Sequence, residues 1–160
     1  MRFTAAFTAL ALLAAAALPA PASAQEVVRY GREGSLLLES VELGAGAKTL
    51  ILGGYAAAPL DPNDRAKGYG DTKTQTISTL KKMQAVLEKH GYKMSDMVKM
   101  NIFVVTDPAL GKADYAGVNA GFKEFFQTAA NPNTVARTAL EIKALQSPDL
   151  YVEIEGWAAR

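Results

Sequence analysis

One arginine and a pair of glutamates near the end of the chain are the residues best suited to chemistry. Arg137 lies close to the start of an apolar and β-branched run, 135–142, which follows an Asn-Pro-Asn turn. Glu153 and Glu155 occupy alternate positions of a second run, 150–157, so both project from one face of a strand. We expect the two runs to be neighbouring strands joined by a Pro-containing turn. Such residues form either an ion pair or a site for a small polar molecule, and both interpretations stay open at this stage.

The other titratable residues favour structural roles. His90 is the only histidine and precedes Gly91 at the expected end of a helix, where a positive charge suits the helix dipole. Asp61, Asp64 and Asp71 are loop or cap residues, and their spacing is not that of a calcium loop. We therefore predict no metal site and no cofactor.

The first 24 residues have the pattern of a secretory signal peptide. Arg2 gives a positive start, an Ala/Leu-rich run follows over 5–18, and Ala22-Ser23-Ala24 supplies small residues for cleavage. The apolar run is too short to anchor the chain across a bilayer. We expect cleavage after Ala24, one domain over 25–160 and a periplasmic or secreted address. An uncleaved membrane tether is the alternative.

Charge and cysteine usage limit the possible functions of this domain. The chain has 17 Lys and Arg against 16 Asp and Glu, so loss of Arg2 leaves 16 of each. A neutral chain without a basic block is a poor candidate for binding nucleic acid, which requires neutralisation of phosphates. The absence of cysteine excludes disulfides, thiolate nucleophiles and zinc–thiolate sites. No apolar run after the signal is long enough to span a membrane, so we expect no membrane partner.

Hydrophobic periodicity predicts an α+β domain with the order β-β-α-β-α-β-β. Strands are expected over five runs: 35–43, 48–57, 96–105, 135–142 and 150–157. Residues 25–34 are polar, which predicts a loosely held start. A glycine pair, Gly53-Gly54, interrupts the second strand and indicates a bulge or a close backbone approach.

Two helices are expected between these strands. The first begins at Asp71 or Thr72, has the capping-box spacing of Thr72 and Gln75, and stops before Gly91. The second helical region begins at 106–108. Its apolar stripe is predicted to be core and comprises Tyr115, Val118, Phe122, Phe125 and Phe126.

Two helices can cover only one face of a mixed sheet. The strand segments LILGGY and MNIFVV are apolar on both faces, so the second face also needs cover. Another subunit is the natural cover, and the pattern therefore predicts a homo-oligomer.

Several short motifs, in their order and spacing, resemble the RidA/YjgF/YER057c/UK114 family of reactive-intermediate deaminases. They extend over nearly the whole chain from about Leu36. The motifs are VELG at 41–44, Gly54 before an Ala/Pro strand end, LDP at 60–62, QTISTLKKMQAVLEKHGYKMSDMVKMNIFV at 75–104, VNAGFKEFF at 118–126, VART at 135–138 and VEIEGWA at 152–158.

This resemblance implies a fold, an assembly and an activity. The fold would be a chorismate-mutase-like α+β subunit, with three subunits in a homotrimer and ligand sites in the clefts between them. Family members of the deaminase type hydrolyse 2-imino acids to 2-keto acids and ammonia. The expected partner is thus a small 2-imino or 2-keto carboxylate.

The resemblance also implies roles for individual residues. Arg137 would hold the substrate carboxylate, since a guanidinium can donate two parallel charge-assisted hydrogen bonds to it. Glu153 would direct the attacking water. Gly54 would let the backbone approach the ligand, and Thr138 keeps the hydroxyl of the serine in the family's motif.

The chain departs from the family pattern around the pocket. Leu37 stands where the family has a tyrosine that closes the pocket, and Glu39 stands in place of a glutamine. Tyr55 is a candidate to supply the aromatic hydroxyl that Leu37 lacks. These changes keep a second hypothesis open, in which the protein is a non-catalytic trimer that binds small carboxylates or acts like a chaperone.

Overall fold

The computed structural model describes residues 27–160, so the predicted signal peptide and its cleavage site lie outside the described residues. The elements along the chain are β1 (Val27–Tyr30), β2 (Ser40–Leu43), β3 (Thr49–Ala56), α1 (Thr72–Lys89), β4 (Met97–Asp107), β5 (Lys112–Ala113), α2 (Tyr115–Phe122), β6 (Ala136–Ile142) and β7 (Val152–Ala159). No helix in this part of the chain is long and apolar enough to cross a bilayer.

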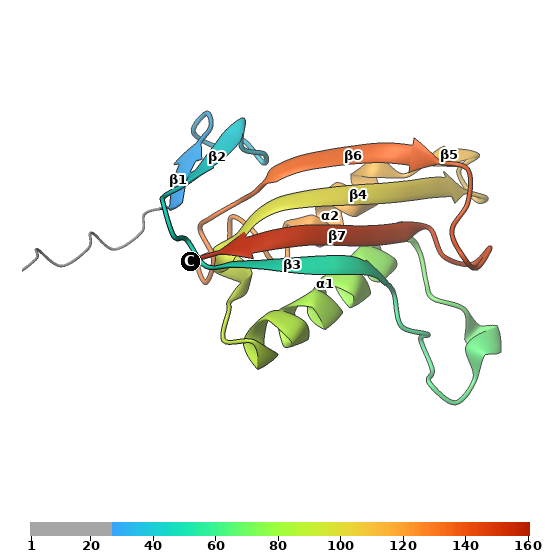
Figure 1. Ribbon diagram of the computed structural model, residues 1–160. Coiled ribbons are helices and arrows are strands. Elements are labelled where there is room, and N and C mark those ends of the chain that lie inside the picture. Colours follow the sequence, from blue (N-terminus) through green and yellow to red (C-terminus); the bar gives the residue numbers. More distant parts are fainter. Residues whose placement is uncertain (1–26) are drawn as a thin grey trace, which may run out of the picture.

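The main sheet is built around β4, the longest strand (Figure 1). β7 pairs antiparallel with one edge of β4 and carries β3 on its far side, while β6 runs parallel along the other edge of β4. β5 continues this second edge beyond the end of β6. The prediction that 135–142 and 150–157 are neighbouring strands is wrong, because β4 lies between them. Although the two runs follow each other in sequence, each of them pairs with β4, which lies in the middle of the sheet.

A small hairpin of β1 and β2 packs beside the beginning of β6 (Figure 1). Arg29 on β1 anchors it by donating from Nη2 to the backbone oxygen of Ser95 at 2.9 Å. The Leu38 amide donates to the Val135 carbonyl at 3.0 Å. The expectations of a loose start over 25–34 and a strand over all of 35–43 are therefore wrong, since 27–30 is a strand and only 40–43 continues as one.

Helix α1 has its predicted position but a different cap. Asp71 caps it, with Oδ1 accepting from the Thr74 amide at 2.7 Å. The predicted capping box is wrong because the Gln75 side chain turns inward, donates to the Gly70 and Asp149 carbonyls and accepts from the Tyr151 amide. Gln75 thereby ties α1 to the segment that leads into β7.

Helix α2 is shorter and later than predicted. β4 continues to Asp107, and α2 begins only at Tyr115, where the Asp114 side chain accepts from the Gly117 amide at 2.8 Å. Tyr115 is 41% exposed, so its assignment to the core is wrong. A side chain in the first turn of a helix that lies at the edge of the sheet need not point inward.

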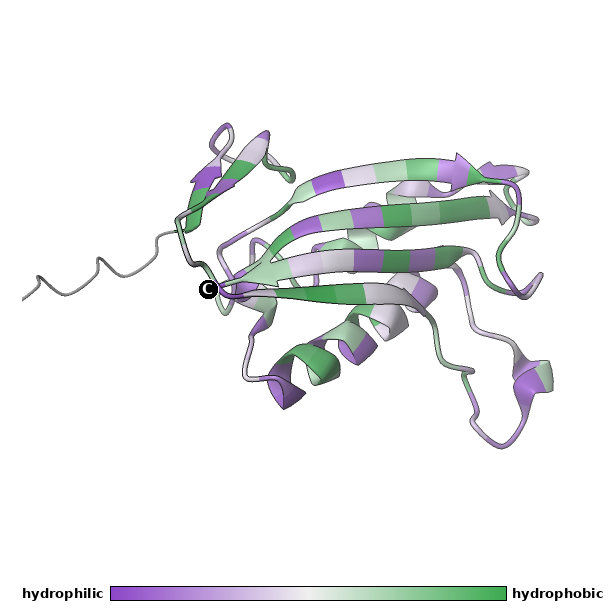
Figure 2. Ribbon diagram, viewed as in Figure 1, coloured by the Kyte–Doolittle hydropathy of each residue, from purple (hydrophilic) through white to green (hydrophobic). Residues whose placement is uncertain are grey.

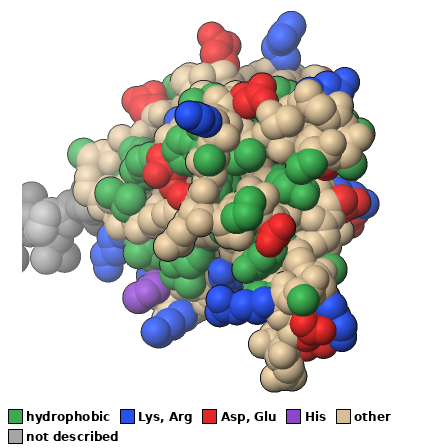
Figure 3. Space-filling model, turned by 90° about the vertical axis from the view of Figure 1, so that its right-hand side faces the viewer, with side chains coloured by type: hydrophobic (Ala, Val, Ile, Leu, Met, Phe, Trp, Pro, Cys, Tyr) green, Lys and Arg blue, Asp and Glu red, His purple; other side chains and the backbone are tan. Residues whose placement is uncertain are grey.

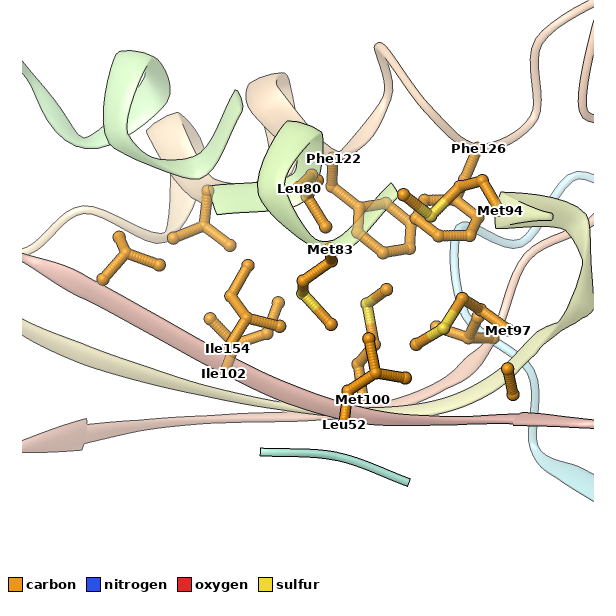
Figure 4. Close-up of a cluster of buried hydrophobic side chains, with 14 of the residues drawn as sticks. Leu52, Leu80, Met83, Met94, Met97, Met100, Ile102, Phe122, Phe126 and Ile154 are labelled. Carbon is orange, nitrogen blue, oxygen red and sulfur yellow. The ribbon is translucent and has the colours of Figure 1, made fainter. Parts of the chain in front are cut away.

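The core lies between the two helices and the sheet (Figure 4). Leu80 and Met83 of α1 face Ile102 and Ile154 of the sheet, and all four are fully buried. A Cβ on Gly121 of α2 would lie 2.7 Å from the Cβ of Thr76 on α1. Glycine at 121 therefore allows the two helices to pack closely.

The sheet has two different faces, which we call the helix-covered face and the open face. Residues alternate between them along β4 and β7, and Figure 2 shows this alternation of hydrophobic and hydrophilic residues along β7. The alternation predicted for 150–157 is confirmed. On the open face Ile51 is 68% exposed and Leu140 is 40% exposed. These two exposed side chains lie on the face that the sequence predicted to need cover, and polar residues such as Asn101 and Glu155 lie on the same face.

Candidate functional site

Arg137 lies on the edge strand β6 and points to the helix-covered face. It is paired in register with Met100, a fully buried residue of β4. Its Nη2 donates to Oδ1 of Asn119 on α2 at 2.5 Å. Its guanidinium carbon lies 4.6 Å from the centre of the Phe122 ring. Two residues of α2 therefore fix the plane and the direction of this guanidinium.

The Arg137 side chain is half-buried and has no carboxylate within ion-pair distance among the described residues. Burial lowers its pKa, and no opposing charge contributes to the shift. Within residues 27–160, its Nε and Nη1 are buried and have no hydrogen-bond partner. A buried donor that is left unsatisfied costs about 1–3 kcal/mol, and more when it is charged. A bound anion would supply the missing acceptors.

The ion pair that the sequence left open is not formed. Oε1 of Glu141 accepts from the Thr106 hydroxyl at 2.7 Å, and Oε1 of Glu155 accepts from Nδ2 of Asn101 at 2.8 Å. In the described part of the chain, Arg137 forms no salt bridge with either glutamate. The internal ion pair is therefore not found among the described residues, and the ligand site stays a prediction.

Glu153 and Gly54 lie together on the open face. Glu153 is paired with Phe103 of β4 and with Ala56 of β3. The ladder between β3 and β7 is irregular between Leu52 and Tyr55, so the bulge expected at the glycine pair is confirmed. A Cβ on Gly54 would collide with the Glu153 carboxylate. Glycine at 54 therefore leaves the space that the Glu153 side chain occupies.

Arg137 and Glu153 project from opposite faces of the sheet within one subunit. Their partners on β4 are Met100 and Phe103, which differ by an odd number of residues and so face opposite sides. One substrate cannot contact both side chains of a single chain. A site that uses both must take Arg137 from one subunit and Glu153 from another.

Thr138 lies on the open face, away from Arg137. Its hydroxyl accepts from Nζ of Lys99 at 2.9 Å. Burial lowers the pKa of Lys99, and the charge of Glu155 partly opposes that shift. Thr138 thus belongs with the polar groups of the open face in the single subunit.

Leu37 lies in the segment between β1 and β2, beside the strand that carries Arg137. Its neighbour Leu38 forms a parallel bridge with Ala136. Leu37 lines a hollow of about 450 Å³ whose other walls are Arg32, Ser35, Leu38 and Glu39. The structure therefore brings Leu37 close to the start of β6, as a pocket residue near Arg137 would require.

Tyr55 does not share a face with Gly54 and Glu153. It is paired with Ile154, on the helix-covered face, and packs against the core. Strands β7 and β4 separate β3 from β6, which carries Arg137. Within one subunit, Tyr55 is therefore not brought to either group of candidate residues.

Sequence reasoning missed Asn119 and Phe122 as the partners of Arg137. Phe122 was assigned to the core, where it does lie, stacked on Phe126 with ring centres 4.3 Å apart. Asn119 carried one usable signal, since it lies three residues before Phe122 and so on the same side of a helix. A polar residue on an apolar helix stripe indicates a buried polar partner.

Comparison with known proteins assigns the chain to a family. The model of the Endoribonuclease L-PSP family matches residues 48–160. The chain is 34% identical over 102 residues to the 2-iminobutanoate/2-iminopropanoate deaminase of Salmonella typhimurium, covering 64% of this chain and 73% of that protein. It is 31% identical over 100 residues to a RutC family protein of Pyrococcus horikoshii, covering 62% and 71%.

Solved structures agree with this assignment. The YjgF gene product of Escherichia coli is 30% identical, with a TM-score of 0.56 over 82% of this chain and 93% of that one. A Rid family protein, YyfB of Yersinia pestis, has the same fold, with a TM-score of 0.63 at 24% identity over 85% and 98%. The chain belongs to the Endoribonuclease L-PSP family, and its relatives of known structure include YjgF and Rid proteins. The predicted family and its chorismate-mutase-like fold, with two helices on one face of a mixed sheet, are confirmed.

Proposed function

We propose that the protein hydrolyses 2-imino acids to 2-keto acids and ammonia at sites shared between subunits of a homotrimer. The single observation that carries the proposal is the Arg137 guanidinium, which has no carboxylate within ion-pair distance and keeps two buried donors without an acceptor among the described residues. A substrate carboxylate is complementary in charge and can accept two parallel hydrogen bonds from a guanidinium. The names of the deaminases at 34% identity support the choice of reaction.

In this proposal Arg137 binds and Glu153 transfers protons. Arg137 holds the carboxylate of the imino acid beside Asn119 and Phe122. The Glu153 carboxylate of the neighbouring subunit takes a proton from water as the oxygen attacks the imine carbon. The proton passes to the nitrogen, which completes the carbinolamine. Glu153 then moves the hydroxyl proton to the nitrogen as the carbon–nitrogen bond breaks, so that the keto group forms and ammonia leaves. Water and imine thus give keto acid and ammonia with no cofactor.

The other candidate residues divide between the two sides of the shared site. Leu37 would contact the substrate from the side of Arg137, because its segment packs against β6. Gly54 would lie on the side of Glu153, whose carboxylate it adjoins. Thr138 and Tyr55 would bind substrate only through surfaces formed by the assembly.

Assembly as a homotrimer is part of the proposal. The open face supports it, because Ile51, Leu140 and Phe103 on that face have no helix over them. The opposite directions of Arg137 and Glu153 support it independently. A single subunit would thus supply Arg137 to one shared site and Glu153 to another.

We further propose that residues 1–24 are a signal peptide and that the mature protein acts in the periplasm or outside the cell. The support is the sequence pattern alone, a positive start, a short apolar run and small residues before Gln25. Sequencing the amino terminus of the exported protein tests this. Gln25 as the first residue is expected, and a retained Met1 would contradict it.

The activity is tested by imine hydrolysis with protein beginning at Gln25. An amino-acid oxidase generates the imine in place, and semicarbazide traps the fraction that escapes hydrolysis. The unaltered protein should accelerate keto-acid release, and Arg137→Ala should lower kcat/KM by about a hundredfold through loss of the carboxylate anchor. Glu153→Gln should lower kcat with little change in KM. If the rates equal the buffer blank for several imines, the proposed hydrolysis is contradicted, and the binding of small carboxylates is the hypothesis that remains.

A further inference from the structure

The hydrogen bond between Asn119 and Arg137 joins a neutral acceptor to a charged donor. Oδ1 of Asn119 accepts from Nη2 of Arg137 at 2.5 Å. A guanidinium has only donors, so the Asn119 amide must turn its oxygen towards Arg137. Within residues 27–160, no salt bridge involves Arg137. The side chain that contacts this guanidinium therefore leaves its charge unneutralised.

Asn119 also decides which edge of the guanidinium faces a ligand. A guanidinium can bind a carboxylate along either of two edges, and Nη2 contributes one N–H bond to each. Asn119 takes one of these N–H bonds. Along the other edge, Nη2 lies beside Nε or Nη1, and both of these atoms are buried without an acceptor among the described residues. One complete edge thus stays available for a carboxylate.

The ring of Phe122 complements this hydrogen bond. It lies under the guanidinium, with 4.6 Å between the guanidinium carbon and the ring centre, and it stacks on Phe126. A contact with the face of a planar group holds its plane but does not prevent rotation within that plane. Rotation is restricted by the contact at the edge, which Asn119 makes.

Helix α2 is placed so that Asn119 faces β6. Gly117 and Gly121 lie on the side of α2 that packs against α1, where an added Cβ would lie 3.1 Å and 2.7 Å, respectively, from a threonine Cβ. At about 3.6 residues per turn, Asn119 lies on the opposite side of α2 from these glycines. The close contact with α1 therefore directs Asn119 towards Arg137.

The overall charge of the protein gives little help to an anionic ligand. The chain has 17 basic and 16 acidic residues. On the end of the molecule shown in Figure 3, acidic and basic side chains are interspersed, so this face has no field of one sign. Attraction of a carboxylate therefore depends on the local charge of Arg137.

We propose that Asn119 is a positioning residue that makes the site selective for anions, because it orients Arg137 without neutralising it. This inference rests on the proposed function, in which Arg137 holds the substrate carboxylate. Asn119→Asp would keep the shape of the side chain and place a carboxylate against the guanidinium. The substrate would then have to compete with an internal ion pair.

Calorimetric titration with 2-ketobutanoate, the keto acid that corresponds to 2-iminobutanoate, tests the role of Asn119. Asn119→Asp should weaken binding about thirtyfold, because the new carboxylate pairs with Arg137. Asn119→Ala should weaken it only about fivefold, through loss of one orienting hydrogen bond. Asn63→Asp, the same change at an exposed turn, should bind like the unaltered protein.

Thermal unfolding without ligand gives a readout that a merely structural role would not move in the same direction. Asn119→Asp should raise the midpoint by about 3 °C, because the new ion pair satisfies the guanidinium, whereas Asn119→Ala should lower it. The inference is overturned if Asn119→Asp is less stable than the unaltered protein, or if it binds 2-ketobutanoate more tightly than Asn119→Ala does.

Imine hydrolysis by the same variants separates this inference from the proposed function. Asn119→Asp should raise KM about thirtyfold and change kcat less than about threefold, as expected for lost substrate binding. If the unaltered protein hydrolyses imines and Asn119→Asp behaves like it, the positioning role fails and the proposed function stands. If the unaltered protein binds 2-ketobutanoate but hydrolyses no imine, the proposed function fails and the affinities alone decide on Asn119. Absence of both binding and hydrolysis would overturn both.

Discussion

The two faces of the sheet carry different halves of the proposed chemistry. On the helix-covered face, α1 and α2 close a core of fully buried side chains, and α2 holds Arg137 in a fixed direction. On the open face, Glu153 lies beside Phe103 and Gly54, and Ile51 further along the same face is exposed. The hydrophobic core of the helix-covered face is closed within one chain, whereas no described helix covers the open face. In the proposed trimer, another subunit would cover the open face.

The largest effect is expected from a charge on the open face. Phe103→Glu would bury a carboxylate in the proposed subunit interface, which costs about 3–5 kcal/mol when the charge is unpaired. Sedimentation should show the unaltered protein as a trimer and this variant as a folded single chain without imine hydrolysis. Trimers of Phe103→Glu at the same stability would contradict the assignment of this face to the interface.

A matched pair of leucines compares packing on the two faces. Leu80→Ala on α1 removes a fully buried side chain and should lower the free energy of unfolding by about 3 kcal/mol. Leu140→Ala on the open face should cost less than about 1 kcal/mol, because that side chain is 40% exposed. Urea denaturation at dilutions where sedimentation shows single chains gives both values. Equal costs would mean that the two faces are equally packed within the subunit.

Elements set by local sequence patterns were predictable, whereas pairings between residues far apart in the sequence were not. Helix α1 and the alternation of β7 follow from local periodicity, and the bulge follows from Gly53-Gly54, so all three were predictable. The position of β6 was not, because strand pairing is decided by burial of the whole sheet. The strand at 27–30 was not predicted, because its polar residues are held by contacts with residues far away in the sequence, such as that of Arg29 with Ser95.

The same distinction applies to the candidate site. Arg137 and Glu153 were identified through motifs, yet motifs carry no information on which sheet face a residue occupies. The face of Arg137 follows from its register with Met100, a contact between residues 37 positions apart. Its partner Asn119 likewise required the packing of α2 against β6.

A smaller effect is expected from removing the half-buried charge of Arg137 in the absence of ligand. Arg137→Met keeps a long side chain over Phe122 but removes a desolvated cation that has no carboxylate, so the free energy of unfolding should rise by about 1 kcal/mol. Binding of 2-keto acids should be lost at the same time. Thermal unfolding and calorimetry measure the two effects. A less stable variant would show that the protein itself satisfies the guanidinium.

The smallest effect concerns Lys99 on the open face. Burial lowers its pKa in the folded chain below the ordinary value of 10.5, so the unfolded chain binds more protons just below that pH. Stability should therefore rise with pH in this window, and Lys99→Met should remove that contribution. Urea denaturation at neutral pH and towards 10.5 should show the stability difference between variant and unaltered protein shrinking as pH rises. A constant difference would contradict the lowered pKa.

The most direct test of the shared site is complementation between two inactive variants. Arg137→Ala and Glu153→Ala are produced together and purified as mixed trimers, with each variant alone as the control. If Arg137 and Glu153 act from different subunits, random mixing restores both residues at about one quarter of the sites, and about one quarter of the activity on imines returns. If the two residues act within one chain, every site in the mixture lacks one of them. Activity no higher than that of the separate variants would contradict the account.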